Sequence, residues 1–293
     1  MIITVIGLGV MGAPMAFNLL AAGNDVIGIN RSRSAVDRFV AMGGRTAELT
    51  AAIAASDAVI TILPDSPDVR DVYLGDAGIV AHARTGTILV DMSTIDPEVS
   101  REIDARAHER GLSVLDAPVS GGEQAAIDGT LSIMVGGSAD DLQRARGLFE
   151  VLGRTIIHVG PTGAGQTVKA ANQLLVAGSI QLVAEALVFL RAHGVDLEPA
   201  VRVLAGGLAG NRILDRKAAG MIAHEFAPGF RIALHHKDLG IFATAARQAG
   251  VVTPLGAIVG QLMASAVANG EGDLDHSALL LSAERASGVD TNL

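Results

Sequence analysis

The start of the chain places a strand, a glycine-rich turn and a helix in an order that few folds accommodate. Residues Ile2–Ile6 form an apolar, β-branched run, a helix is expected over Pro14–Ala22, and a second apolar strand follows at Asp25–Ile29. A short apolar strand that turns tightly into a helix is typical of a unit with parallel strands. The pattern therefore predicts an α/β domain at this end of the chain.

The turn between the first strand and the helix has the spacing G-x-G-x-x-G. Gly7 permits the tight turn, Gly9 lets the backbone approach a pyrophosphate, and Gly12 lets the helix pack closely against the strand. The N–H groups that begin the helix would bind phosphate oxygens. We predict a dinucleotide site at Gly7, Gly9, Val10, Met11 and Gly12; the alternative is that the glycines only turn the chain.

Apolar runs and helical segments alternate up to about residue 160, and strand signals then cease. This predicts a Rossmann domain with a parallel sheet over residues 1–162, then an all-helical domain over 163–293 entered by a long helix. Strands from Ser132 onward have short connections, so an antiparallel course is open for them. Further expected strands are Ala58–Leu63, Thr87–Asp91, Ser113–Leu115, Ser132–Val135 and Thr155–Val159; further expected helices are Ser34–Met42, Pro67–Leu74, Pro97–Arg110 and Ala139–Leu152.

Composition narrows the partners. The chain has 293 residues, a net charge of -9 and no cysteine. A negative net charge without a basic run argues against nucleic acid, and the lack of cysteine excludes disulfides and a thiolate nucleophile. We predict a small-molecule ligand, no nucleic-acid partner and no membrane.

A mean hydropathy of +0.42 raises the question of a membrane span. The most apolar stretch, Val168–Leu190, contains polar residues that are costly in lipid: Lys169, Asn172, Gln173, Gln181 and Glu185. A buried helix explains this stretch better than a span. The chain also opens directly into a strand instead of a secretion signal, so we predict a cytoplasmic protein.

The end of the second strand bears on the choice of cofactor. Enzymes that use NAD commonly have an acidic residue there, whereas arginine suits the 2′-phosphate of NADP. Here the chain reads Ile29-Asn30-Arg31-Ser32-Arg33. Arg31 would attract the phosphate, and Asn30 and Ser32 would donate hydrogen bonds, so NADP(H) is favoured over NAD(H). The alternative is that both arginines are solvated surface charges.

Two other strand ends carry candidate ligands. Thr94 follows Asp91-Met92-Ser93 and would contact the nicotinamide ribose, or else cap the helix near Pro97. Ser120, Gly121 and Gly122 close another strand, and successive N–H groups in such a turn form a concave anion site for a carboxylate. An ordinary serine–glycine loop is the alternative.

One helix carries a polar stripe among small and apolar residues. Lys169, Asn172 and Gln173 are three and four residues apart, so they share one face. A lysine kept out of water gives up its proton more readily, which suits proton transfer. A surface lysine is the alternative. Further on, Lys237 is a candidate cofactor ligand; the neighbouring His235 and His236 point apart on a helix, so no metal is predicted.

Taken together, the motifs resemble the β-hydroxyacid dehydrogenase family over essentially the whole chain. The resemblance implies that Lys169 is the general acid/base, that Asn172 and the Ser120–Gly122 loop contact the substrate, and that Thr94 and Lys237 bind the cofactor. It also implies cofactor contacts at Leu63 and Pro64 and a dimer or tetramer. The motifs are GLGVMGAPMAFNLLAAG, ITILPD, LVDMST, DAPVSGGEQAAIDGTLSIMVGG, GAGQTVKAANQ and HHKDL.

Within that family, segments such as GGLAGNRILDRKA and FAPGFRIALHHKDL resemble those of enzymes that act on tartronate semialdehyde, which implies its reduction to D-glycerate. Oxidation of 3-hydroxyisobutyrate or of another short β-hydroxy acid is the alternative. Imine reductases share the architecture but usually replace the lysine, and the second domain is too short for a decarboxylating phosphogluconate enzyme. A non-catalytic dinucleotide-binding protein is the alternative from a different class.

Overall fold

A computed structural model describes residues 1–288. Its internal contacts divide the chain into two compact units, Met1–Lys169 and Ala170–Leu293, so the division falls inside one long helix. The boundary at residue 162 stays a prediction.

The first unit is built on one sheet with the strand order β2-β1-β3-β4-β5-β7-β6, and β8 pairs with β7. β1 to β5 are parallel, as predicted. β7 runs antiparallel to β5 and β6, and β8 is parallel to β7, so both of the last strands run antiparallel to β1–β5, the course that their short connections left open. The strands are β1 Ile2–Ile6, β2 Asp25–Ile29, β3 Ala58–Thr61, β4 Ile88–Asp91, β5 Val114–Asp116, β6 Val119–Ser120, β7 Leu131–Gly136 and β8 Gly153–Gly160.

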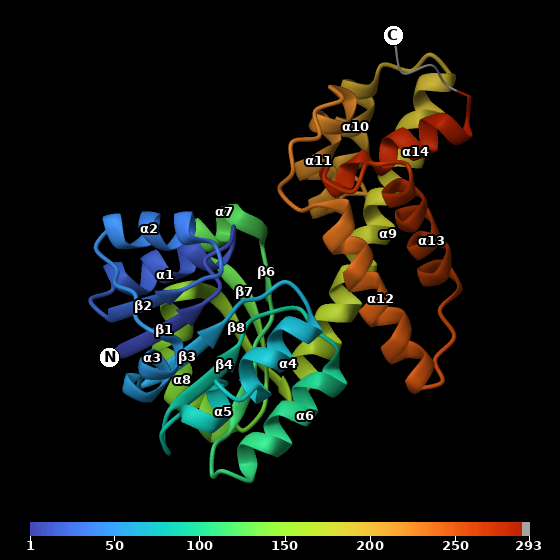
Figure 1. Cartoon of the computed structure of the whole chain (residues 1–293). Helices are drawn as coiled ribbons and strands as arrows, with labels where there is room; N and C mark the ends of the chain where they lie inside the picture. The colour runs from blue at the N-terminus through green and yellow to red at the C-terminus, as the bar shows by residue number, and fades with distance from the viewer. Residues whose placement is uncertain (289–293) are drawn as a thin grey trace. The chain divides into compact units, whose positions relative to one another are not determined.

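Helices cover both faces of this sheet (Figure 1). Alternate strand residues enter two separate cores: Ile3 and Val5 pack with α1, α2 and α8, whereas Ile6 packs with α4 and α6. Successive side chains of a strand point to opposite faces of the sheet. Because these strands are apolar throughout, both faces must be covered by helices. The helices are α1 Gly12–Ala21, α2 Arg33–Ala41, α3 Leu49–Ala55, α4 Ser66–Leu74, α5 Ile79–His82, α6 Pro97–His108, α7 Gly122–Ile127 and α8 Ala139–Leu152.

Capping explains where α6 begins. The carboxylate of Asp96 accepts a hydrogen bond from the Glu98 N–H, and Pro97 occupies the first turn. The alternative role for Thr94, a cap for this helix, is therefore wrong, because Asp96 fills that position.

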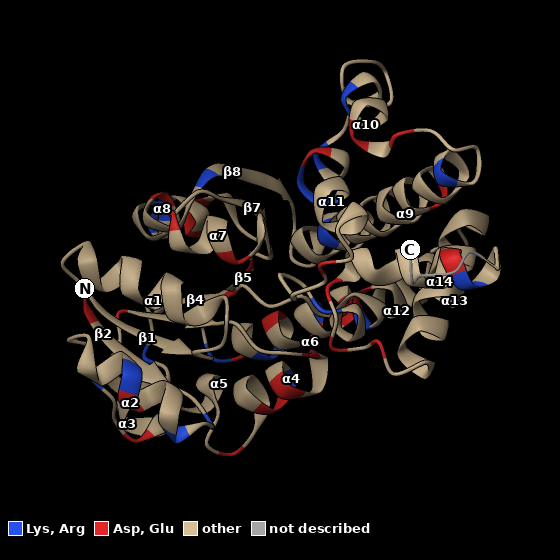
Figure 2. Cartoon of the chain, turned by 90° about the horizontal axis from the view of Figure 1, so that it is seen from above, with Lys and Arg blue, Asp and Glu red and all other residues tan. Residues whose placement is uncertain are grey.

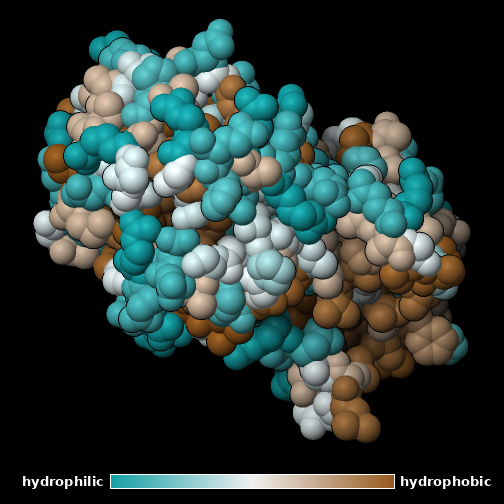
Figure 3. All heavy atoms as spheres, turned by 90° about the horizontal axis from the view of Figure 1, so that it is seen from below, coloured by the Kyte–Doolittle hydropathy of each residue, from teal (hydrophilic) through white to brown (hydrophobic). Residues whose placement is uncertain are grey.

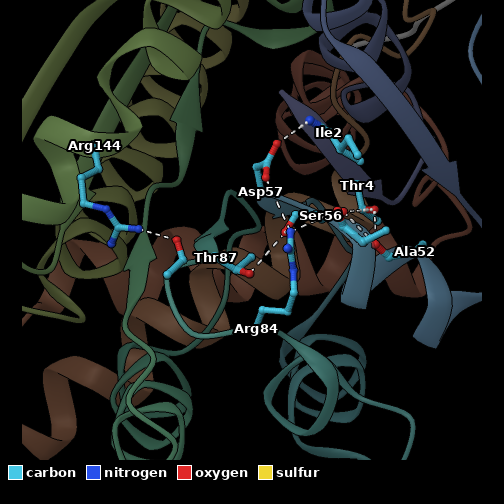
Figure 4. Close-up of polar contacts among 10 residues, drawn as sticks. Ile2, Thr4, Ala52, Ser56, Asp57, Arg84, Thr87 and Arg144 are labelled. Carbon is cyan, nitrogen blue, oxygen red and sulfur yellow. Dashed lines mark hydrogen bonds and ion pairs between the residues drawn. The ribbon is translucent and has the colours of Figure 1, made fainter.

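Polar side chains hold together the amino ends of the central strands (Figure 4). Asp57 accepts from the Ile2 N–H at 2.9 Å, and the Arg84 guanidinium donates to the Ser56 carbonyl at 3.0 Å. Thr4 and Ser56 share a buried hydroxyl–hydroxyl bond of 2.7 Å. With this edge tied by internal bonds, the carboxyl edge is where ligand-binding groups are to be sought.

The second unit is helical, as predicted. Among its described residues the only strand-like pairing is a single bridge between Arg231 and Asp275. Its core is formed by side chains such as Ile180, Met221 and Met263, each of them 0% exposed. The helices are α9 Ala164–Ala192, which begins in the first unit, α10 Leu197–Ala205, α11 Arg212–Ile222, α12 Ile232–Gln248, α13 Pro254–Ala268, a 3-10 helix His276–Ala278 and α14 Leu279–Ala286.

Over residues 1–288, α9 is the single helix whose length and apolar composition would allow it to cross a membrane. That is weak evidence, since the core helix of a soluble protein meets the same test, and 44% of its most apolar window is buried. Gln166, Lys169, Gln173 and Gln181 are among its buried residues, and each is costly to place in lipid.

Acidic and basic residues are interspersed along the chain (Figure 2). Many form short-range pairs on helices, such as Arg146 with Glu150 at 3.0 Å and Arg101 with Glu98 at 2.7 Å. Exposed pairs of this kind contribute about 0–1 kcal/mol each. They keep the surface mixed in sign.

Candidate cofactor and catalytic site

The carboxyl edge of the parallel strands gathers the candidate residues of the first unit. The order β2-β1-β3 places β2 and β3 on opposite sides of β1, so the direction of chain crossover reverses between β1 and β3. Ligands of open α/β sheets bind at such a reversal. The glycine turn follows β1 here, and Leu63 and Pro64 follow β3.

The three glycines of the turn have different surroundings. Gly7 has φ +107°, and a Cβ there would lie 2.2 Å from the Ile62 carbonyl oxygen. A Cβ on Gly12 would lie 1.9 Å from the Gly7 carbonyl oxygen. At Gly9, in contrast, a Cβ would have no protein atom within 4 Å. Gly7 and Gly12 are therefore needed by the fold, whereas Gly9 leaves open space beside the backbone, which fits the approach of a pyrophosphate.

The start of α1 also fits a phosphate. Its N-cap residue, Met11, makes no side-chain capping bond, so the first turn has no internal anionic or hydroxyl partner from that position. Val10 beside it is 61% exposed. A helix start with this arrangement offers N–H groups and the positive end of the dipole to an anion.

The end of β2 holds the three residues predicted to choose the cofactor. Asn30 accepts a hydrogen bond from the Leu8 N–H at 3.0 Å and so ties β2 to the glycine turn. The Ser32 hydroxyl is 3.0 Å from that of Ser34. Arg31 lies 3.2 Å from Asp68, and its side chain is 83% exposed. The side-chain oxygen of Asn30 thus already accepts a hydrogen bond from the turn. Arg31, in contrast, pairs with Asp68 at the surface.

The loop that carries Thr94 is fixed to the sheet. The Ser93 hydroxyl donates to Asp91 at 2.6 Å and accepts from the Leu63 N–H at 2.8 Å. Thr61 donates to the same Asp91 oxygen at 2.7 Å. Ser93 and Asp91 are almost fully buried, whereas Thr94 is partly exposed. These bonds bring Leu63 and the Thr94 loop together at one edge.

Two glycines shape the turn after β6. Gly121 has φ +136° and Gly122 has φ +75°, both in the region that favours glycine. A Cβ on Gly121 would lie 2.5 Å from the Ala125 side chain. Ser120 stays partly exposed beside them. The turn therefore offers a hydroxyl and accessible backbone at the start of α7.

A buried carboxylate fixes the start of α9. Asp116, at the end of β5, accepts from the Gly163 N–H at 2.8 Å and from the Gln166 N–H at 2.9 Å. Burial raises the pKa of Asp116 to about 6, and these two N–H donors oppose the rise. A Cβ on Gly165 would lie 2.4 Å from the Met134 carbonyl oxygen. The helix is thus seated directly against the sheet.

Lys169 follows on the same helix and is 7% exposed. A surface position for this lysine is therefore wrong. A lysine this deeply buried needs a partner or a function to offset its desolvation. It is one of only three lysines in the chain, with Lys217 and Lys237.

In the second unit, four polar residues of the predicted motifs form one chain of bonds. The Asn172 amide donates to the Gln173 side chain at 2.9 Å, and the Gln173 amide donates to Asp238. Asp238 also pairs with Lys237 at 3.0 Å. Gln173 and Asp238 are 4% and 2% exposed. Asn172 and Lys237 are thereby fixed relative to each other through two buried side chains.

The histidines of α12 are not arranged for a metal. His235 Nε2 is 3.0 Å from the Gln173 carbonyl oxygen, which only accepts, so this nitrogen carries a hydrogen. His235 Nδ1 lies 3.0 Å from His276 Nδ1, so the two rings share a hydrogen bond. Over residues 1–288 no group of three or more histidine or acidic side chains could hold a metal ion.

This histidine pair predicts an acid-sensitive stability. Burial lowers the pKa of His276 to about 3; His235 and Lys217 add to the lowering, and Asp275 opposes it. Because the unfolded chain binds the proton more readily, the stabilisation is complete above pH 6.5 and is lost as pH falls towards 3. Between pH 7 and pH 5 the loss is about 2 kcal/mol. Urea unfolding at both pH values measures this loss. From pH 7 to pH 5, the free energy of unfolding should fall by about 2 kcal/mol less in His276→Asn than in the wild type. An equal fall in both proteins would contradict the assignment.

Sequence reasoning missed the residues that position the site. Gln166, Asp116 and Ser93 are buried at the carboxyl edge and join loops that are distant in sequence. Gln166 precedes Lys169 by one helical turn, and Asp116 ends a strand, which are the signals that would have found them. All twelve predicted cofactor positions and the predicted substrate positions stay predictions of role.

Two family models match the chain. Residues 2–160 match the NAD binding domain of 6-phosphogluconate dehydrogenase. Residues 163–282 match the model described as NAD-binding of NADP-dependent 3-hydroxyisobutyrate dehydrogenase. The two matches together cover most of the chain and agree with a Rossmann domain followed by a helical domain.

Relatives of named activity match nearly the whole chain. The 2-hydroxy-3-oxopropionate reductase of Escherichia coli is 41% identical over 95% of this chain and 96% of its own length. The NAD-dependent L-serine dehydrogenase of Pseudomonas aeruginosa is 40% identical over 94% and 95%.

Solved structures show the same fold. The 3-hydroxyisobutyrate dehydrogenase of Mycobacterium tuberculosis, with L-serine, has a TM-score of 0.88 and 36% identity over 96% of this chain and 98% of that chain. Psf3 in complex with NADP+ and 2-OPP has a TM-score of 0.87 and 25% identity over 96% and 99%.

The chain belongs to the β-hydroxyacid dehydrogenase family. It is an NAD(P)-dependent oxidoreductase of β-hydroxy acids, as the sequence predicted.

Proposed function

We propose that the chain reduces tartronate semialdehyde to D-glycerate with NADPH, and that Lys169 is its general acid/base. The catalytic role of Lys169 is supported by its burial. Lys169 lies one helical turn after Gln166, which is bonded to the loop that carries Thr94. The substrate is supported by the relative named 2-hydroxy-3-oxopropionate reductase, whose substrate is the same semialdehyde.

Bound NADPH supplies the hydride that adds to the carbonyl carbon. Lys169 gives its proton to the carbonyl oxygen as that oxygen gains charge, and in the reverse direction it removes the proton from the hydroxyl. Asn172 lies three residues further along the helix, and its amide already donates to Gln173. Its carbonyl oxygen therefore suits an acceptor role, which orients the lysine or the substrate hydroxyl.

The turn at Ser120, Gly121 and Gly122 holds the substrate carboxylate in this proposal. The positive φ angles of both glycines turn the backbone through conformations that bring successive N–H groups to one side of a turn. The serine hydroxyl adds a further donor. The proposed substrate has such a carboxylate, separated from the reacting aldehyde by one carbon.

Cofactor choice gives a separable prediction. The pair between Arg31 and Asp68 is largely exposed, so Arg31 leaves it at a cost of about 0–1 kcal/mol to bind a 2′-phosphate. Arg31→Glu should lower kcat/KM with NADPH by about 10–100-fold, the value of a charge-assisted hydrogen bond, and spare NADH. Steady-state kinetics with each cofactor measures this.

Arg33→Glu is the matched control, since Arg33 is 91% exposed, pairs with Asp37 and lies on the same segment. Equal losses in both variants would mean that only the general charge of the segment matters. An unchanged ratio of NADPH to NADH in Arg31→Glu would remove Arg31 from the phosphate site.

The substrate is tested by comparing tartronate semialdehyde, methylmalonate semialdehyde and succinic semialdehyde with both cofactors. We expect the highest kcat/KM for tartronate semialdehyde. Preference for methylmalonate semialdehyde would favour the 3-hydroxyisobutyrate alternative, which the relative of that name in Pseudomonas aeruginosa supports at 36% identity. L-Serine belongs in the same comparison, run in the direction of oxidation.

A homo-oligomer is part of the proposal. α9 exposes Leu175, Leu182 and Phe189, which are 70%, 68% and 61% exposed and lie seven residues apart on one helical face. α13 adds the exposed Leu255 and Ile258, and Figure 3 shows apolar side chains gathered on the helical unit. Such a stripe suits burial against another subunit. A monomeric mass by light scattering would overturn the proposed homo-oligomer.

The cytoplasmic location stays a prediction.

A further inference from the structure

The side chain of Gln166 joins α9 to the loop that carries Thr94. It is 1% exposed, and both ends of its amide are bonded. Its Nε2 donates to the Ser93 carbonyl oxygen at 2.9 Å, and its Oε1 accepts from the Ile95 N–H at 3.1 Å. One amide therefore holds the backbone on both sides of Thr94.

The other side of this loop is fixed to the sheet. The Ser93 hydroxyl is bonded to Asp91 and to the Leu63 N–H, at 2.6 and 2.8 Å. The loop is thus anchored to the strands and to α9, and its far end, at Asp96, is bonded to the Ser66 hydroxyl of α4 at 3.0 Å. The Gln166 amide makes the anchor to α9 with both of its polar atoms.

The helix end of this link is equally fixed. The Gln166 N–H donates to the buried Asp116 carboxylate, and Gly165 has no room for a Cβ against the sheet. Lys169 follows three residues later, so it lies on the same helical face as Gln166. One buried amide therefore connects the backbone on both sides of Thr94 to the helical turn that carries Lys169.

We propose that Gln166 is a positioning residue that sets the place of Thr94, and with it the nicotinamide ribose, relative to the Lys169 ammonium. The inference rests on the proposed function, in which Thr94 contacts the cofactor and Lys169 transfers the proton. Gln166 acts on turnover, because hydride and proton transfer depend on alignment, where a displacement of about 1 Å costs about 100-fold. It leaves the phosphate contacts of the glycine turn unchanged.

Gln166→Glu separates positioning from bulk stability through pH. A carboxylate accepts from the Ile95 N–H but cannot donate to the Ser93 carbonyl, whereas a protonated carboxyl does both. Burial raises the pKa of a carboxyl introduced here towards neutrality. We expect the ratio of variant to wild-type kcat to be within about 3-fold of one at pH 5.5 and to fall by about 10-fold or more by pH 8.5. The Kd for NADPH should change by less than about 3-fold at either pH.

Gln166→Met removes both bonds at every pH, so its kcat ratio should be low and flat. The matched control is Gln181→Met, which removes another buried amide of α9 that is bonded to Glu185 at 2.8 Å. It should lower the melting temperature without changing kcat. Ratios near one in both Gln166 variants, or kcat changes equal to those of Gln181→Met, would overturn the proposal.

Hydrogen exchange supplies a readout that needs no turnover. In Gln166→Met, exchange at the Ile95 amide should become at least about 10-fold faster, while the Leu63 amide, held by Ser93, stays protected. If the wild type reduces no semialdehyde, the proposed function fails and exchange alone decides this inference: unchanged protection of Ile95 would then overturn it. If the wild type is active, the pH-dependent ratio and the exchange must agree.

Discussion

Replacing Lys169 by methionine is expected to lower kcat by about 10²–10⁴-fold, the usual contribution of a general acid or base. Methionine keeps most of the buried volume, so the loss would report the missing ammonium group and not a cavity. The Kd for NADPH should stay within about 3-fold of the wild-type value, because the phosphate contacts lie on the glycine turn. Stopped-flow turnover and NADPH fluorescence titration measure the two quantities separately.

Lys217→Met is the matched control. Lys217 donates to both oxygens of Asp275, at 2.8 and 2.9 Å, and takes no part in the proposed chemistry. Its replacement should lower the melting temperature while kcat, measured well below that temperature, stays unchanged. Full turnover in Lys169→Met would end the acid/base assignment. A parallel loss of NADPH affinity would move Lys169 from proton transfer to cofactor binding.

Gly9→Ala should raise the Kd for NADPH by about 100-fold or more without lowering the stability of the protein. The added Cβ would meet no protein atom within 4 Å, so the folded chain accepts it. The same methyl group would stand where the pyrophosphate must approach the backbone. A loss of that size corresponds to about 2.8 kcal/mol of binding free energy. Titration of NADPH fluorescence and thermal unfolding together test the prediction.

Two other glycines bracket this result. Gly12→Ala should lower both stability and affinity, because its Cβ would lie 1.9 Å from the Gly7 carbonyl oxygen. Gly147→Ala, inside α8, also places its Cβ in open space; it should leave affinity unchanged and raise stability by about 0.5–1 kcal/mol. Wild-type affinity in Gly9→Ala would show that the pyrophosphate does not pass this glycine.

Much of the site's composition was predictable because its motifs are local. The glycine turn, the end of β2 and the polar stripe on α9 each depend on residues close together in sequence, and periodicity places them on a turn, a strand end and a helix face. The helical second unit followed from the end of the strand signals. The family resemblance added the roles of Lys169, Ser120 and Thr94, which spacing by itself left open.

The links between motifs were not predictable. Gln166 bonds to Ser93 and Ile95, which precede it by 73 and 71 residues. The pairing of β7 with both β5 and β6 likewise depends on which strand edge is free once the sheet has formed. Local propensity carries no information about such partners, because they are selected by packing.

By itself the sequence determined the α/β unit, the dinucleotide turn and the set of chemical groups, since each is encoded by spacing along one segment. Only the tertiary structure decided that Lys169 is buried, that Asp96 and not Thr94 caps α6, and that Arg31 already pairs with Asp68. Burial and pairing are properties of what other segments place around a side chain. They arise only when residues far apart in the chain compete for the same space and the same hydrogen bonds.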